Sequence, residues 1–324
     1  MTRFRLGFWL QRALICAVVL GAAASVVIYL YAGARGFQIL IRRGGTRWLQ
    51  VRANDPALSP AMRLALQNQP PTATAGALVW RELTPGLDVA ELPVLAAGKE
   101  VDRILLTRVD PSRFHIEVHN SPAGDKDLDG WMKALGGVLV INGSYYERDG
   151  KPSMPMICGG VRRGPRTYDA KNGAFVVKDH AAAIADLRLE PWQLAFKGAH
   201  DALLSYPLLL APDGPHVAKE TRWLANRSFV GQQPDGRLIF GTTRDAFFSL
   251  YRLASFLEHS PLQLTLALNL DGGPVACQAV ALNGFKRDFC GTWEVQAEGE
   301  KLQLLRPLIG HGRWELPVVI AVRR

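Results

Sequence analysis

The chain has 324 residues, of which 48% are hydrophobic, and its 38 lysines and arginines exceed its 29 aspartates and glutamates to give a net charge of +9. This content is enough for one large core or two modest ones. Eight arginines precede the first acidic residue, Asp55, so the rest of the chain is close to neutral. A charge confined to one end argues against a nucleic-acid-binding face and indicates a segment next to a membrane.

Residues 13–34 form an uncharged run that predicts an N-terminal transmembrane helix. The run is rich in Ala, Val, Leu and Ile, is long enough to cross a bilayer, and has Tyr29 and Tyr31 near its far end. The alternative is a cleaved signal peptide, because Ala32-Gly33-Ala34 has the pattern of a cleavage site. We favour an uncleaved anchor on length. In both cases the globular part is expected to be exported, either anchored in the membrane or secreted after cleavage near Ala34.

The cysteines agree with export. Cys277 and Cys290 stand 13 positions apart around a loop that contains Asn283-Gly284, and we predict a disulfide between them. The alternative is that they are free thiols, as is Cys158. Cys16 lies in the apolar segment, and no pair of cysteines has zinc-finger spacing.

Residues 35–100 read as a connector with a short helix over 57–69, and the globular domain is expected to span 101–324. Near the start of this domain, His115, Glu117 and His119 alternate with apolar residues on one strand. Two imidazoles and a carboxylate with this period could bind a metal, and a solvated strand face explains them equally well. We therefore predict no metal and no cofactor.

Two apolar segments deliver polar side chains into glycine turns. The run over 138–141 is followed by Asn142-Gly143-Ser144-Tyr145-Tyr146. Leucines alternate with other residues over 262–270, and the sequence then continues Asp271-Gly272-Gly273-Pro274, with Asn269 and Asp271 on one side of the strand. Each could be an ordinary strand end followed by a turn, or part of a site.

The segment 226–243 predicts a β-hairpin with its turn at Pro234-Asp235-Gly236. Its two open ends meet, which places Arg227 beside Thr242 and Thr243. A helix is expected directly afterwards, with Asp245 as its cap. A guanidinium close to hydroxyls and a helix N-terminus could bind an anion such as phosphate, or Arg227 could pair with a structural carboxylate.

Taken in order, these three segments resemble the phosphodiester glycosidase family. The likeness covers roughly residues 101–290 and lies in Ile141-Asn142-Gly143-Ser144-Tyr145-Tyr146, in Asn226-Arg227-Ser228-Phe229-Val230-Gly231, and in Asn269-Leu270-Asp271-Gly272-Gly273. It implies a single α+β domain with a mixed or antiparallel sheet and flanking helices. It also implies hydrolysis of a sugar-1-phosphodiester, with a phosphorylated glycan as the partner. Two departures from the family pattern concern the substrate: Pro274-Val275-Ala276 replaces the usual Gly-Ser-Ser, and Ser144 replaces a glycine.

The resemblance implies roles for nine residues. Arg227, with Thr243, would bind the phosphate, and Asp271 would act as acid, base or nucleophile at the anomeric carbon. Asn142 and Asn269 would bind sugar hydroxyls or orient Asp271. The remaining substrate contacts would come from a stacking tyrosine and the glycine turn: Tyr145 or Tyr146, Gly272 and Gly273. Glu147 and Asp245 are the nearest candidates in the sequence for a second carboxylate.

Two functions from other classes remain open. One is a non-catalytic envelope module that binds an anionic glycan, and it would keep Arg227 and the aromatic residues without needing Asp271. The other is a metal-dependent phosphodiesterase that uses His115, Glu117 and His119. Nothing in the sequence favours a third possibility, an inhibitor of another exported enzyme.

Overall fold

The computed structural model describes residues 2–43, 46–147, 149–169, 172–179, 181–298, 301–307 and 313–324. The chain divides into two compact units. The first contains residues 1–46 with 307–312, and the second contains residues 47–306 with 313–324.

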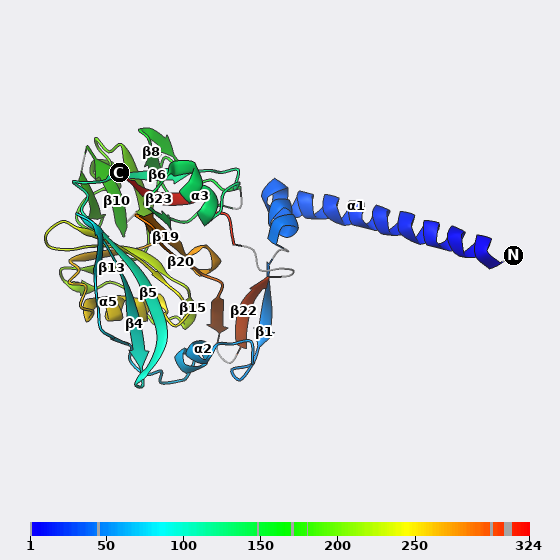
Figure 1. Ribbon diagram of the computed structural model, residues 1–324, viewed down its shortest axis with the longest axis horizontal. Helices are drawn as coiled ribbons and strands as arrows, with labels where there is room; N and C mark the ends of the chain where they lie inside the picture. The colour runs from blue at the N-terminus through cyan, green and yellow to red at the C-terminus, as the bar shows by residue number, and fades with distance from the viewer. Residues whose placement is uncertain are drawn as a thin grey trace. The chain divides into compact units, whose positions relative to one another are not determined.

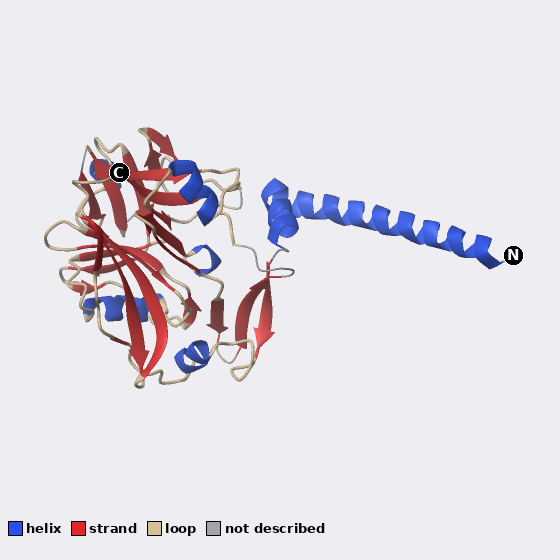
Figure 2. Ribbon diagram, in the orientation of Figure 1, coloured by secondary structure: helices blue, strands red, loops and turns tan. Residues whose placement is uncertain are grey.

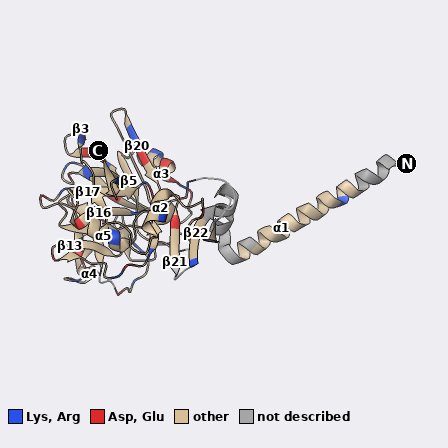
Figure 3. Cartoon of the chain, turned by 90° about the horizontal axis from the view of Figure 1, so that it is seen from below, with Lys and Arg blue, Asp and Glu red and all other residues tan. Residues whose placement is uncertain are grey.

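The first unit is dominated by one long helix, α1 (Thr2–Arg43). Residues Trp9–Val27 have a mean hydropathy of 1.9, which makes this helix long and apolar enough to cross a membrane. Figure 3, which colours charged residues blue and red, shows almost none of them in the described part of the helix. The helix extends beyond the predicted 13–34 at both ends, since no proline interrupts it. It is compatible with either a membrane anchor or a signal segment.

Among the described residues of the second unit, strands outweigh helices and form four sheets (Figure 2). The largest sheet has nine strands: β2 (Thr74–Ala75), β3 (Arg81–Thr84), β4 (Leu87–Ala96), β5 (Lys99–Val109), β13 (Leu208–Ala211), β14 (Gly214–Pro215), β16 (Ser228–Gln232), β17 (Leu238–Thr243) and β18 (Leu266–Asn269). Their order is β14-β13-β18-β16-β17-β5-β4-β2, and β3 pairs with β4. The predicted hairpin is confirmed as β16–β17, with Ser228 opposite Thr242.

The residues predicted as a connector contribute to this sheet. Residues 47–100 belong to the second unit, and β4 pairs with β5 along almost its whole length, as the two long curved strands of Figure 1 show. Pro93 lies inside β4 opposite Arg103 and accepts a hydrogen bond from Gly76 N at its carbonyl. The expectation of a connector over 35–100 was therefore wrong from residue 47 onward, because a proline such as Pro93 fits within a paired strand and does not interrupt it.

Two sheets have five strands each. One consists of β6 (His115–Asn120), β7 (Leu139–Asn142), β19 (Cys277–Leu282), β20 (Phe285–Cys290) and β23 (Val318–Arg323), in the order β20-β19-β7-β23-β6. The other consists of β8 (Met156–Cys158), β9 (Val161–Arg163), β10 (Gly173–Lys178), β11 (Ala181–Asp186) and β12 (Asp201–Ser205), in the order β11-β10-β12-β8-β9.

The fourth sheet has four strands: β1 (Thr46–Val51), β15 (Trp223–Ala225), β21 (Glu294–Glu298) and β22 (Lys301–Pro307), in the order β1-β22-β21-β15. The helices outside α1 are short: α2 (Pro60–Ala65), α3 (Leu128–Leu135), α4 (Trp192–Ala195), α5 (Leu250–Glu258) and the 3-10 turn η1 (Gly273–Val275). Of the predicted α+β domain, the structure shows the part built on sheets, and it adds only a few short helices.

The central strands of the nine-stranded sheet are buried on both faces. In β17, Phe240 packs into one core cluster with Leu268, and the neighbouring Ile239 packs into another with Ala267. For this reason β18 does not have the one-sided burial predicted from its leucines: Ala267 and Asn269 are as buried as Leu268.

The helix after the hairpin begins later than predicted. Its N-cap is Ser249, whose hydroxyl accepts from Arg252 N, and not Asp245. The backbone N–H of Asp245 instead donates to the buried carboxylate of Asp102 at 2.8 Å. By contrast, α3 ends as its sequence suggests, at Gly136, a glycine in the left-handed conformation at φ 57°.

Candidate functional site

Asp271 leaves β18 at the point where that strand passes two other segments. Leu270 N donates to Ser228 O, and Asp271 N donates to Gly143 O at 3.0 Å. The carboxylate accepts from Gly272 N at 2.8 Å and is half-buried. Burial, helped by the negative charge of Glu294, raises the pKa of Asp271 to about 7 against the opposing effects of the Gly272 hydrogen bond and Arg227.

Arg227 is held rigidly beside this aspartate. Its side chain is 6% exposed, with Nε donating to Phe248 O at 3.2 Å and Nη2 to Trp223 O at 2.6 Å. Nη1 lies over Gly272, where a Cβ would come within 3.3 Å of it. The two acceptors, Phe248 O and Trp223 O, are neutral carbonyls, and Arg227 forms no ion pair within the described ranges. A fixed guanidinium without a carboxylate partner is suited to binding an anion.

A second carboxylate, Glu294, faces the same turn and was not predicted from the sequence. Glu294 is opposite Ala225 in the pairing of β15 with β21, which puts it two residues from Arg227 across the sheet. Its Oε1 accepts from Trp223 Nε1 at 2.7 Å, and burial raises the pKa of Glu294 while Trp223 and Arg227 oppose the rise. The pairing with β15 spans about 70 residues, so no local pattern marked this residue.

The two glycines of the turn leave room for these side chains. A Cβ at Gly273 would lie 2.5 Å from Glu294 Oε2, and Gly273 has φ +69°, which favours glycine. Their N–H groups are engaged inside the protein: Gly272 N binds Asp271, and Gly273 N donates to Asn226 O at 2.9 Å. The structure thus gives Gly272 and Gly273 a spatial role, and a direct substrate contact through their N–H groups is not supported.

Asn142 joins the strand ends that meet here. Its Nδ2 donates to Asp271 O at 2.7 Å, and its Oδ1 accepts from Cys277 N at 3.1 Å. The residue is 2% exposed. Of the two roles predicted for Asn142, this geometry supports orientation of Asp271, through its backbone, and not contact with a sugar.

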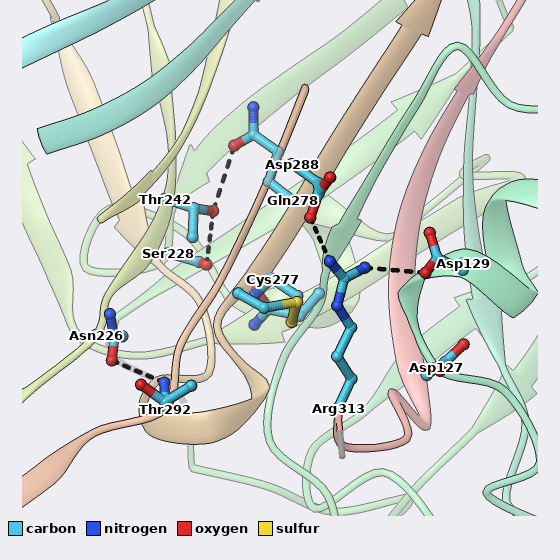
Figure 4. The surroundings of a disulfide bond; sticks show 12 residues. Asp127, Asp129, Asn226, Ser228, Thr242, Cys277, Gln278, Asp288, Thr292 and Arg313 are labelled. Atoms are coloured by element: carbon cyan, nitrogen blue, oxygen red, sulfur yellow. Dashed lines mark hydrogen bonds and ion pairs between the residues drawn. A yellow bond between two sulfur atoms is a disulfide. The ribbon is translucent and has the colours of Figure 1, made fainter. Parts of the chain in front are cut away.

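Asn226, which was not predicted as a site residue, links chain segments next to Arg227 in the way that Asn142 links them next to Asp271. Its Nδ2 donates to Thr243 O and Arg244 O, and its Oδ1 accepts from Thr292 N and Trp293 N. Figure 4 shows the contact between Asn226 and Thr292 near the disulfide. The side chain therefore joins the β17 end to the segment that leads into Glu294.

Thr243 fixes the backbone of Arg227 by a hydrogen bond. Its hydroxyl accepts from Arg227 N at 2.9 Å and donates to Asp245 O at 3.0 Å, and the residue is fully buried. The hydroxyl is thus used by the backbone on both sides, and a role for Thr243 in phosphate binding stays a prediction.

Tyr145 forms a stacked pair with Tyr206, a residue that was not predicted. The ring centroids are 4.5 Å apart with an interplanar angle of 19°. Asn269, which is fully buried, donates from Nδ2 to Tyr145 Oη at 2.8 Å and to Tyr206 O at 2.9 Å. Burial, with the charge of Asp271 adding to it, raises the pKa of Tyr145, so its hydroxyl stays protonated and donates to Tyr206 O. Asn269 therefore holds the tyrosine pair.

Tyr206 is the more accessible ring of this pair, with 43% exposure. Tyr146 packs against two core clusters, and a stacking role for Tyr146 stays a prediction. Neither carboxylate proposed from the sequence joins the site. Asp245 pairs with Arg244 at 3.2 Å, and Glu147 lines a surface pocket of about 660 Å³ that includes neither Arg227 nor Asp271.

The histidine strand has other partners. His119 Nε2 lies 2.9 Å from Glu117 Oε2, and Glu117 also pairs with Arg323 from β23. Within the described ranges, no group of three His, Cys, Asp or Glu side chains is placed to hold a metal ion.

The predicted disulfide between Cys277 and Cys290 is present. It links directly opposite residues of β19 and β20, and Figure 4 shows it beside the segment that contains Thr292. Directly after it, Gly291 N donates to Ala276 O at 2.7 Å. The disulfide thus closes a hairpin whose two ends lead to the Asp271 turn and to Glu294.

The fold and this site define a sheet-rich protein in which a buried arginine, without an ion pair among the described residues, faces two carboxylates. The chain belongs to the phosphodiester glycosidase family, whose model matches residues 136–308. The resemblance predicted from the motifs is therefore confirmed, and the matched range contains Asn142, Arg227, Asp271 and Glu294.

Among solved structures, this chain is similar to the zebrafish N-acetylglucosamine-1-phosphodiester α-N-acetylglucosaminidase catalytic domain auto-inhibited by its pro-peptide. The two are 15% identical over 86% of this chain and 88% of that one, with a TM-score of 0.50, which supports the fold. A hypothetical protein from Synechocystis is 14% identical over 77% and 64% of the two chains, with a TM-score of 0.48. A putative exported protein from Burkholderia pseudomallei is 9% identical over 72% and 76%, with a TM-score of 0.39. No curated protein matches the sequence.

Proposed function

We propose that this protein is an exported hydrolase that cleaves the glycosidic bond of a sugar-1-phosphodiester in envelope or extracellular glycan. The observation that carries this proposal is the buried guanidinium of Arg227, which lacks an ion pair within the described ranges and lies against the Asp271 turn. Membership of the phosphodiester glycosidase family supports the same reaction class.

The reaction needs both groups. A phosphodiester leaves the anomeric carbon readily once its charge is neutralised, and a preorganised guanidinium supplies that charge where it develops. Arg227 would therefore bind the phosphate, and Asp271 would act on the anomeric centre. Asn142, Asn226 and Thr243 position these two residues.

Two further features support an exported, membrane-anchored location. α1 is long and apolar enough to cross a bilayer. The Cys277–Cys290 disulfide is typical of proteins from oxidising compartments.

The full-length protein in detergent should be incubated with methyl phosphodiesters of hexose-1-phosphates and N-acetylhexosamine-1-phosphates, in water labelled with ¹⁸O. Cleavage at the anomeric carbon places the label on the free sugar and releases methyl phosphate. Asp271→Asn should abolish the reaction, and Arg227→Lys should raise KM by about tenfold or more, because an ammonium loses the planar fork of the guanidinium.

Product identity separates the alternatives. A phosphodiesterase would release sugar-1-phosphate and methanol, would place ¹⁸O on phosphate, and would contradict the proposal. Binding of the diesters without turnover, unchanged in Asp271→Asn, would instead identify a glycan-binding module.

A further inference from the structure

We propose that Glu294 is the second catalytic carboxylate of this site and acts as the general base that activates water, with Asp271 as its acid partner. Glu294 has this role only if the glycosidase function proposed above is correct. Glycoside hydrolysis usually needs two carboxylates, one for the leaving group and one for the attacking water or the sugar.

The position of Glu294 is fixed from two sides. Trp223 Nε1 holds Oε1 at 2.7 Å, and the Gly273 Cα leaves just enough room for Oε2. The backbone carbonyl of Trp223 also accepts from Arg227 Nη2. One residue therefore anchors both the guanidinium and the carboxylate, which sets their mutual geometry.

The surrounding charges assign the two carboxylates different roles. The groups that act electrostatically on Asp271 are Glu294 from β21 and Arg227, while Tyr145 and Tyr206 are its neutral phenol neighbours. Burial raises the pKa of Glu294 as well, but its donor Trp223 and its charged neighbour Arg227 both favour the ionised form, and Asp271 is not among the groups that raise it. The proton of the pair is thus held by Asp271, whose pKa the charge of Glu294 raises further.

The step balances with one water. Glu294 accepts a proton as the water oxygen bonds to the anomeric carbon. The bond from that carbon to the phosphate oxygen breaks, and its electron pair leaves on the phosphate, where Asp271 delivers its proton. The products are the free sugar and a phosphate monoester, and solvent exchange returns the proton from Glu294 to Asp271.

The test uses Glu294→Gln, which keeps the acceptor for Trp223 and removes the basic oxygen. On the diester that the wild-type protein cleaves fastest, kcat should fall by about 10²- to 10⁴-fold while KM changes little. The wild-type pH profile should be bell-shaped, and Glu294→Gln should lose its acidic limb, which a merely structural residue would not affect. Glu100→Gln, at a surface pair with Arg103, is the matched control and should retain wild-type rates.

A kcat for Glu294→Gln close to that of the wild type would overturn the proposal and leave the glycosidase function intact. If the wild-type protein cleaves none of the diesters, the proposed function fails, and the pair is still testable by infrared titration of the full-length protein. The carboxyl band assigned by its loss in Asp271→Asn should titrate near neutral pH in the wild type and at lower pH in Glu294→Gln. An unchanged titration would overturn the pairing itself.

Discussion

At the scale of single residues, the site depends on side chains whose partners lie far away in the sequence. The motifs predicted that Arg227 and Asp271 would meet, and the structure brings both to the Gly272 turn. They did not predict that the side-chain amide of Asn142 would donate to Asp271 O, 129 residues away in the sequence. An amide that contacts substrate and one that holds a loop look the same in a sequence, because only the tertiary pairing decides which hydrogen bonds it makes.

Ionisation of Asp271 should destabilise the protein. Its folded pKa of about 7 lies above the ordinary value, so the folded state holds a proton that the unfolded state has lost. Stability is therefore lost as pH rises from about 4 to about 7, by at most about 1.4 kcal/mol for each pH unit, and by less in a half-buried group that solvent screens.

Asp271→Asn should remove this loss while keeping an acceptor for Gly272 N. We expect the thermal midpoint of the variant to match that of the wild type near pH 4 and to exceed it above pH 7, in scanning calorimetry of the full-length protein. A difference that does not vary with pH would show that the carboxyl is not buried in its charged form.

Tyr206 is expected to be the aromatic contact for the sugar, because its ring is exposed and is supported from behind by Tyr145. Tyr206→Ala should raise KM about 3- to 10-fold with a small effect on kcat, as expected for losing about 0.5–1.5 kcal/mol of ring contact. Tyr251→Ala, on α5 with a similar exposure of 44%, is the control. Equal KM values for the two variants would argue against a contact between the Tyr206 ring and the sugar.

At the scale of elements, hairpins with local turn signals were predictable and strands closed by distant partners were not. The β16–β17 hairpin follows from its own turn residues. β4 was missed because Pro93 interrupts its pattern, although it pairs with the adjacent β5. Glu294 was missed because its place in the site depends on the pairing of β21 with β15, and these two strands are too far apart in the sequence to be joined by a turn.

The disulfide hairpin should be needed for activity as well as stability, since its ends lead to Asp271 and Glu294. Cys277→Ser combined with Cys290→Ser opens a loop of 13 residues, for which the chain-entropy relation gives about 3 kcal/mol. We expect a lower thermal midpoint and, at temperatures where the variant is still folded by circular dichroism, a loss in kcat larger than the change in KM. Cys158→Ser should have neither effect, and equal activity of the double variant and the wild type would show that the strands hold the turn unaided.

At the scale of the whole molecule, the charge distribution divides the chain nearly as its two compact units do. Six arginines and no acidic residue lie in residues 1–46, so only +3 of the net charge of +9 belongs to the much larger sheet-rich unit. An electrostatic attraction to anionic polymers is therefore not a property of the whole surface. In the function proposed above it comes from particular groups such as Arg227, so that substrate binding would be local and dependent on one guanidinium.

The length of α1 favours an anchor over a cleaved signal, and the two have different consequences for the intact protein. A signal peptide has an apolar core of about 7–15 residues, whereas Trp9–Val27 provides a 19-residue apolar span inside a continuous helix. We therefore expect the protein to stay in the membrane fraction after alkaline carbonate washing and to show an intact N-terminus by mass spectrometry. A C-terminal alkaline phosphatase fusion should be active, since that reporter folds only where disulfides form. A mature chain that starts near residue 35 would establish secretion, and an inactive fusion would place the site on the cytoplasmic side, where the Cys277–Cys290 bond would not persist.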